Sequence, residues 1–257
     1  AQHIFQTENR RETDAYLGLE GPLREAIRIN QLEVHYQPQV SLKTGKCHAV
    51  EGLLRWSLGD RGPIAPPAII RIAEANGMIG SLTAWVMNTV LRHQAEWRQH
   101  GMDLATSLNF STITLADTDL PEVMSQALGT WSADPAKVTV EITESSTIGD
   151  ADQSLAVMKR LKQMGLRLSV DDFGTGYSSL SYVKKFPLDE LKIDKLFVQH
   201  MRLTKGDQQI VRSVIDLAHN FELSVVAEGV EDEATYKDLK KMGCDLAQGF
   251  HMSPAPP

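Results

Sequence analysis

The chain has 257 residues, of which 42% are hydrophobic and 23% are charged, and its formal net charge is −7. This is the composition of a soluble globular protein with enough length for a large core, and its acidity excludes a protein that holds duplex nucleic acid on a broadly basic surface. No apolar run approaches the roughly 20 residues that cross a bilayer, no secretory signal is present, and the two cysteines, Cys47 and Cys244, are not spaced as a metal-binding or redox pair.

Short apolar or β-branched runs, each bounded by turn residues, recur along the chain and predict strands. Most of them are separated by segments with helical periodicity, such as the stretch after Pro66 that places Ile69 and Ile72 on one face. The predicted strands cover residues 32–40, 47–56, 104–111, 137–145, 166–174, 190–198, 223–231 and 244–252. The predicted helices cover residues 66–78, 81–100, 119–129, 151–164, 206–220 and 232–242, with a weaker connection at 177–187.

Eight strands that alternate with helices predict an α/β fold of the modified (β/α)8 TIM-barrel type. A doubly wound open sheet is the competing architecture, but the strands are regularly spaced and no second domain is visible. The first two strands are joined by the short turn "KTGK" without a helix, so we expect them to be antiparallel. Residues 1–20 are polar and are expected to be a helical lead-in from a missing upstream domain, and residues 21–257 are expected to form the barrel.

Nearly every predicted strand carries a polar residue among apolar neighbours toward its carboxyl end, where barrel enzymes place their chemistry. These residues are Glu51, Asn109, Glu141, Asp171, Asp172, Lys192, Glu228, Glu231 and Gln248. So many carboxylates cannot all stay ionised in one small mouth without cations, and one lysine is too few. Oxygen ligands without histidine or cysteine favour Mg²⁺ or Mn²⁺ over zinc, and two such ions would suit an in-line displacement at phosphorus.

Two other readings of these motifs have less support. The tripeptide "DFG" at 172–174 also occurs in protein kinases, but no kinase glycine-rich loop, lysine strand or HRD-type loop accompanies it. A Schiff-base enzyme of the aldolase type would use Lys192 as its nucleophile. That reaction needs a depressed lysine pKa, whereas surrounding carboxylates raise it.

Several ordered motifs from about Leu23 to the end resemble the EAL-domain phosphodiesterases, which open cyclic di-GMP to the linear dinucleotide pGpG with Mg²⁺ or Mn²⁺. These motifs are "EGLLRW", "LNFS", "EITES", "SVDDFGTGYSSLSYVKKFPLDELKID", "VVAEGVE" and "QGF". The resemblance implies a modified (β/α)8 barrel with an antiparallel first strand pair. One departure is Gly52, which stands where the family signature has alanine; it alternates away from the ligand face.

The resemblance also implies roles for individual residues. The implied metal ligands are Glu51, Asn109, Glu141, Asp171 and Asp172, the last of these for a second ion. The residues implied to position or activate the attacking water are Glu228, Lys192 and Glu231. The implied contacts of the bound nucleotide are Gln37, Arg55 and Gln248, and Glu144 matches the anchor of the loop "FGTGYSSL".

We therefore expect a metal-dependent cyclic di-GMP phosphodiesterase of bacterial signalling. The alternative is a catalytically silent EAL domain that acts as a cyclic di-GMP receptor; such domains usually lack a metal ligand, and this chain keeps every position that can be matched. The family loop implies a homodimer, and the lead-in implies an upstream sensory or GGDEF-type domain. We expect a cytoplasmic location without direct membrane insertion by this segment, and a membrane anchor elsewhere in the full-length protein stays open.

Overall fold

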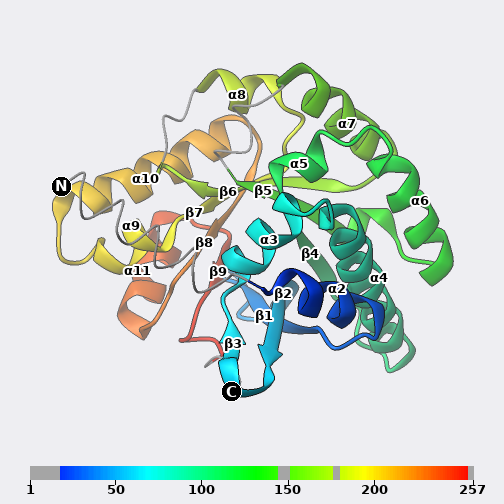
Figure 1. The fold of residues 1–257 in the computed structure, drawn as a ribbon. Helices are drawn as coiled ribbons and strands as arrows, with labels where there is room; N and C mark the ends of the chain where they lie inside the picture. Colours follow the sequence, from blue (N-terminus) through cyan, green and yellow to red (C-terminus); the bar gives the residue numbers. More distant parts are fainter. Residues whose placement is uncertain (1–17, 144–150, 176–179, 254–257) are drawn as a thin grey trace, which may run out of the picture. The chain divides into compact units, whose positions relative to one another are not determined.

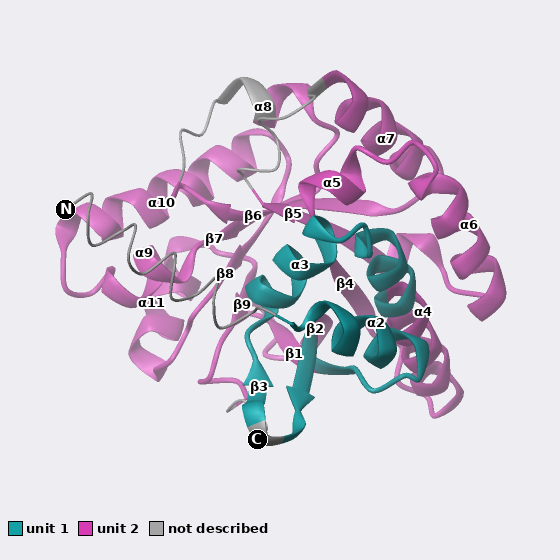
Figure 2. Cartoon of the chain, in the orientation of Figure 1, with its two compact units in different colours: residues 1–35, 54–86 teal, residues 36–53, 87–257 magenta. Residues whose placement is uncertain are grey.

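The computed structural model describes residues 18–143, 151–175 and 180–253, and these divide into two compact units. Unit 1 comprises residues 1–35 and 54–86, and unit 2 comprises residues 36–53 and 87–257 (Figure 2). The strands β1 (Glu33–Ser41) and β2 (Cys47–Leu58) and the helix α4 (Ile79–Gln99) each begin in one unit and end in the other.

Unit 2 contains a closed barrel of eight strands (Figure 1). Besides β1 and β2, its strands are β4 (Ala105–Phe110), β5 (Val138–Thr143), β6 (Arg167–Phe173), β7 (Glu190–Ile193), β8 (Ser224–Ala227) and β9 (Leu246–Gln248). Neighbouring strands are parallel from β2 through β4 to β9, whereas β1 pairs antiparallel with β9 and closes the ring against β2. The barrel and its single reversed strand are therefore confirmed.

The helices of unit 2 follow the strands in the predicted alternation. They are α5 (Thr112–Leu115), α6 (Leu120–Trp131), α7 (Ala151–Gln163), α8 (Leu180–Lys185), α9 (Lys195–His200), α10 (Lys205–Asn220) and α11 (Glu233–Met242), with a 3-10 turn at Pro135–Lys137. Alternate residues of each strand face the helices. For example, α10 packs against β7 and β8, and Leu191 and Val225 are fully buried. The other face of each strand points into the barrel.

Unit 1 has its own apolar core. It contains α2 (Glu20–Arg28), β3 (Gly62–Ile64), α3 (Pro66–Ala75) and a 3-10 turn at Gly59–Arg61. The indole of Trp56 is 2% exposed and packs with side chains of α2 and α3, including Leu23 and Ile69. None of the helices in the described part of the chain combines the length and apolarity needed to span a bilayer.

The predicted strand at 190–198 is half wrong. Asp194 ends it, because its carboxylate accepts a hydrogen bond from the Leu196 backbone nitrogen at 2.6 Å and caps helix α9. The predicted helical lead-in falls mostly on residues 1–17, which lie outside the described residues. The domain boundary at residue 20 stays a prediction.

Gly249, which follows the last residue of β9, allows two backbone segments to meet. Its φ is +155°, and a Cβ atom there would overlap the backbone nitrogen and carbonyl oxygen of Val230. The approach is close because the Val230 nitrogen donates to the Gln248 carbonyl oxygen at 3.0 Å. We therefore expect Gly249→Ala to lower the free energy of unfolding by about 2–3 kcal/mol, measured by urea denaturation.

The exposed helical residue Gly129 is the control for this substitution. A Cβ there meets no atom within 4 Å, so Gly129→Ala should raise the free energy of unfolding by about 0.5–1 kcal/mol. Equal effects of the two substitutions would show that the contact with Val230 has no energetic consequence.

Candidate metal centre

Lys192 lies at the centre of a carboxylate cluster inside the barrel of unit 2. Its side chain is fully buried, and its Nζ lies 2.7 Å from Glu141 Oε2, 2.7 Å from Glu228 Oε1, 3.2 Å from Glu51 Oε2 and 3.2 Å from Asp171 Oδ1. Glu141 lies on β5, Glu228 in the loop after β8, Glu51 on β2 and Asp171 on β6. These elements are not all neighbours in the sheet. Only side chains that point into the barrel could meet in this way.

The carboxylate of Glu51 is held at both oxygens. Asn109 donates its Nδ2 to Oε1 at 2.6 Å, and Gln248 donates its Nε2 to Oε2 at 2.5 Å. Gln248 also donates to Gln37 Oε1 at 3.0 Å. Lys192 and these two amides together hold the pKa of Glu51 below its usual value, although burial pushes it upward.

Asp171 and Asp172 both belong to the cluster, although neighbouring residues of a regular strand point to opposite faces. The β6–β7 register shifts between Val170 and Phe173, and Asp172 has a φ of +55°. Its backbone nitrogen donates to Asp171 Oδ1 at 3.0 Å. One oxygen of each aspartate and one of Glu228 lie within 4.8 Å of one another. The irregularity therefore gives the barrel two adjacent carboxylates on one side.

One ammonium group does not neutralise these acids. Burial raises the pKa of Glu228 to about 8, and burial together with the charges of Asp171 and Asp194 raises that of Asp172 to about 7. Burial and the charge of Glu51 hold the pKa of Glu141 well above its usual value. A divalent cation placed among these acids would lower their pKa values and stabilise their ionised forms.

The donor set fits a divalent cation. Glu141 Oε1 is buried and has no hydrogen-bond partner, so it is free to bind an ion. Single oxygens of Glu51, Glu141 and Asp171 lie within 4.8 Å of one another and form a second group beside that of Asp171, Asp172 and Glu228. All of these ligand atoms are oxygens, which hard ions such as Mg²⁺ and Mn²⁺ prefer.

The raised pKa of Lys192 argues against a Schiff-base enzyme with this lysine as its nucleophile. Burial alone would lower it, but the charges of Glu141, Glu51 and their neighbours hold it well above its usual value. A protonated amine has no lone pair with which to attack a carbonyl. The Lys192 environment is therefore that of a counter-ion.

Three residues singled out from the sequence are not part of this described cluster. Glu231 is exposed in the loop after β8, where it accepts a hydrogen bond from Gln199 Nε2 at 2.7 Å. Arg55 belongs to unit 1, where its Nη1 donates to the Leu54 carbonyl oxygen at 2.9 Å. Glu144 and the whole "GYSS" segment (176–179) of its loop lie outside the described residues. The roles of these residues stay predictions.

Two residues of the site were missed in the sequence. The negative charge of Asp194 contributes to the raised pKa of Asp172. Gln39 is 1% exposed and donates its Nε2 to Gln248 Oε1 at 3.0 Å. A usable signal existed for the second: Gln37 and Gln39 are two apart on one strand and so share a face.

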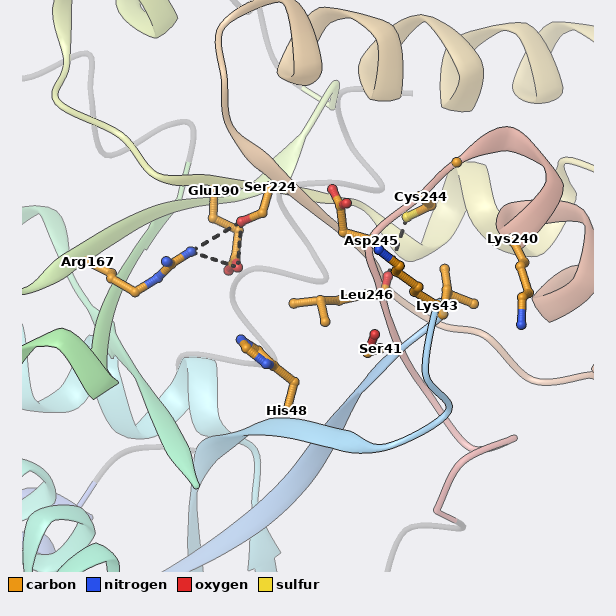
Figure 3. Close-up of a pocket in the computed structure, with 12 residues that line it drawn as sticks. Ser41, Lys43, His48, Arg167, Glu190, Ser224, Lys240, Cys244, Asp245 and Leu246 are labelled. Carbon is orange, nitrogen blue, oxygen red and sulfur yellow. Dashed lines mark hydrogen bonds and ion pairs between the residues drawn. The ribbon is translucent and has the colours of Figure 1, made fainter. Parts of the chain in front are cut away.

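A cavity of about 610 Å³ lies at the opposite end of the barrel, where β6 to β9 begin (Figure 3). Within it, Arg167 Nη2 donates to Ser224 Oγ at 3.2 Å and lies 3.8 Å from Glu190 Oε2 (Figure 3). Neither metal group includes these residues. Residues at this end of a TIM barrel usually serve stability.

Glu190 is 4% exposed, and burial raises its pKa above the usual value despite the nearby charge of Arg167. A carboxyl whose pKa is raised by folding favours the folded state at low pH, and this contribution is lost as the pH rises through the folded-state pKa. The wild-type free energy of unfolding should therefore fall as the pH rises, by at most about 1.4 kcal/mol per pH unit from this group, and Glu190→Gln should remove that fall. Urea denaturation between pH 5 and 8 would measure it, and parallel curves for the two proteins would contradict it.

Residues 21–255 match the EAL domain family. The chain is 37% identical over 248 residues to the Pseudomonas aeruginosa protein MucR, which is named a bifunctional diguanylate cyclase/cyclic di-GMP phosphodiesterase. The aligned region covers 96% of this chain and 36% of MucR. It is also 36% identical to the Escherichia coli cyclic di-GMP phosphodiesterase PdeR, and that aligned region covers 96% of this chain and 37% of PdeR. A solved structure titled "PaMucR Phosphodiesterase, c-di-GMP complex" matches with a TM-score of 0.88 and 38% identity over 94% of this chain and 98% of that one.

Proposed function

The chain belongs to the EAL domain family, and we propose that it hydrolyses one phosphodiester bond of cyclic di-GMP to give the linear dinucleotide pGpG. The observation that carries this proposal is the convergence of four carboxylates on the buried ammonium group of Lys192. Relatives of similar sequence that are named cyclic di-GMP phosphodiesterases support the substrate. Because the chain spans little more than a third of their length, the activity of the whole protein belongs to the proposal as well.

We propose that the centre holds two Mg²⁺ or Mn²⁺ ions. Glu51, Asn109, Glu141 and Asp171 would ligate the first, and Asp172 would ligate the second together with Asp171. Asn109 uses its amide nitrogen on Glu51, which leaves its carbonyl oxygen for an ion. When bound, the ions supply Lewis-acid stabilisation of the charge that develops on the phosphoryl oxygens.

The groups around Lys192 would guide the attack by water. Glu228 lies 2.7 Å from Lys192 Nζ, and one of its oxygens lies within 4.8 Å of single oxygens of Asp171 and Asp172, so its carboxylate would be the group that takes the proton of the attacking water. The water oxygen bonds to phosphorus, its proton passes to Glu228, and the phosphorus bond to the 3′-oxygen breaks. The leaving oxygen takes a proton from solvent. Lys192 orients the water and Glu228, and Glu231 supports the water network.

The remaining assignments concern partners. We propose that Gln37, Arg55 and Gln248 contact the nucleotide, that Glu144 anchors the loop after β6, and that the protein is a cytoplasmic homodimer. The short coverage of the relatives agrees with further domains in the full-length chain, and we propose a sensory or GGDEF-type domain upstream.

The test is to incubate the purified protein with cyclic di-GMP and Mn²⁺ and to separate the products by chromatography. Linear pGpG should accumulate with Mn²⁺ and not with EDTA. Tight nucleotide binding in Mn²⁺ without any product would contradict the enzyme and favour the receptor alternative. The folded state of each sample should be checked by circular dichroism.

A further inference from the structure

Three glutamine side chains form a hydrogen-bonded row beside Glu51. Gln39 donates its Nε2 to Gln248 Oε1 at 3.0 Å, and Gln248 donates its own Nε2 to Glu51 Oε2 at 2.5 Å and to Gln37 Oε1 at 3.0 Å. Gln39 and Gln248 are direct partners in the antiparallel pair of β1 and β9. The row therefore runs across the strand pair in which the reversed strand meets the last strand of the barrel.

The donors and acceptors of this row can be arranged in only one orientation of the Gln248 amide when Glu51 is ionised. An amide group donates from its nitrogen and accepts at its oxygen, whereas an ionised carboxylate only accepts. Gln248 must therefore turn its nitrogen toward Glu51, and its oxygen then faces β1. Gln39 donates to that oxygen, which stabilises this orientation of the Gln248 amide over the flipped one.

The orientation of the Gln248 amide matters energetically because the row is buried. Gln39 is 1% exposed and Gln248 is 4% exposed, so water does not readily replace a lost hydrogen bond. In the flipped orientation the Gln248 oxygen would face Glu51 Oε2, and two acceptors would stand against each other. The Glu51 carboxylate would then rotate away from the position set by Asn109 and Lys192.

We propose that Gln39 is a positioning residue of the metal centre, which fixes the direction of the Gln248 amide and through it the carboxylate of Glu51. The inference rests on the proposed function insofar as Glu51 is taken to bind a divalent cation. Gln39 itself touches neither the cation nor the substrate. Partners of metal ligands commonly change metal affinity by about 10–100-fold when they are replaced.

The test compares two substitutions by titrating Mn²⁺ into the protein without nucleotide, with calorimetry as the readout. When ionised, the new carboxylate of Gln39→Glu offers only acceptors, so at a pH above its pKa Gln248 should turn its nitrogen toward residue 39 and its oxygen toward Glu51. We expect the Kd for Mn²⁺ to rise about 10–100-fold. Gln39→Met removes the donor without adding an opposing acceptor, and its Kd should rise less. This second variant keeps the test decisive if the buried carboxylate prevents folding.

A matched control is Gln94→Met. Gln94 is also a buried glutamine, 7% exposed, but it donates to Thr106 Oγ1 and to the carbonyl oxygens of Leu104 and Lys137. This substitution should lower the melting temperature and leave the Kd for Mn²⁺ unchanged. A loss of affinity equal to that of Gln39→Met would mean that the Gln39 effect is one of general stability, which would overturn the proposal.

A double substitution tests the route through Gln248. Once Gln248→Met has removed the amide, adding Gln39→Met should weaken Mn²⁺ binding no further, because no amide remains to be oriented. Fully additive losses would overturn the proposal, and so would wild-type affinity in folded Gln39→Met and Gln39→Glu proteins. If the wild-type protein binds Mn²⁺ but does not cleave cyclic di-GMP, the proposed function fails while these affinities still decide the role of Gln39.

Discussion

Replacing Lys192 with methionine should lower the free energy of unfolding by about 3–5 kcal/mol in the presence of EDTA. The methionine is of similar length but carries no charge, so the carboxylates of Glu51, Glu141, Asp171 and Glu228 lose the ammonium group that contacts all four. Urea denaturation at neutral pH measures the effect. Saturating Mn²⁺ should restore part of the loss, because an ion that binds the folded state stabilises it.

The exposed ion pair between Lys237 and Glu233 provides the control for Lys192. Its atoms are 3.1 Å apart, and both side chains are more than half exposed, so Lys237→Met should change the free energy of unfolding by less than about 1 kcal/mol with or without Mn²⁺. A similarly small change for Lys192→Met in EDTA would contradict a cluster that depends on its central ammonium group.

Glu141→Gln should remove turnover while leaving the metal-free protein as stable as before or more so. The substitution keeps the shape of the side chain and removes a charge whose pKa is held well above its usual value by burial and by Glu51. It also replaces the unpartnered Oε1, which is the atom available to an ion. Losing that ligand should cost several kcal/mol of transition-state stabilisation, or about 10³-fold in turnover.

Both halves of the Glu141 prediction are measurable on one preparation. The urea midpoint in EDTA should not fall, and cyclic di-GMP turnover in Mn²⁺ should fall about 10³-fold. A variant that loses both stability and activity would show that the carboxylate serves the fold. A variant that keeps wild-type turnover would remove Glu141 from the metal centre.

The barrel could be predicted because its signals are local. Apolar or β-branched runs such as "LSVVA" at 223–227 are too short for helices, and segments such as residues 206–220 repeat apolar side chains at helical spacing. The turn at 42–46 has no room for a helix, which required an antiparallel first pair. The polar residues at the strand ends then pointed to a shared mouth.

What could not be predicted depends on contacts between distant residues. The shift in register that aims Asp171 and Asp172 at the same mouth is set by pairing with β7, and no residue type in the sequence announces it. Gln39 shares a strand face with Gln37, but no residue type in the sequence places Gln248 opposite it. Strand β7 ends before Asp194 because the Asp194 carboxylate caps helix α9, so the chain turns at this residue.

Two buried glutamates of the same barrel show whether the acidic cluster at one end of it performs metal-dependent hydrolysis. Glu51 lies in the cluster and is 4% exposed, while Glu190 lies at the opposite end and is also 4% exposed. The measurement is pGpG formation from cyclic di-GMP in Mn²⁺ by wild type, Glu51→Gln and Glu190→Gln. Activity that is lost only in Glu51→Gln and in EDTA is the predicted result. Product formation by folded Glu51→Gln at the wild-type rate, or none by folded wild type with Mn²⁺ bound, would show that the acidic cluster does not perform this reaction.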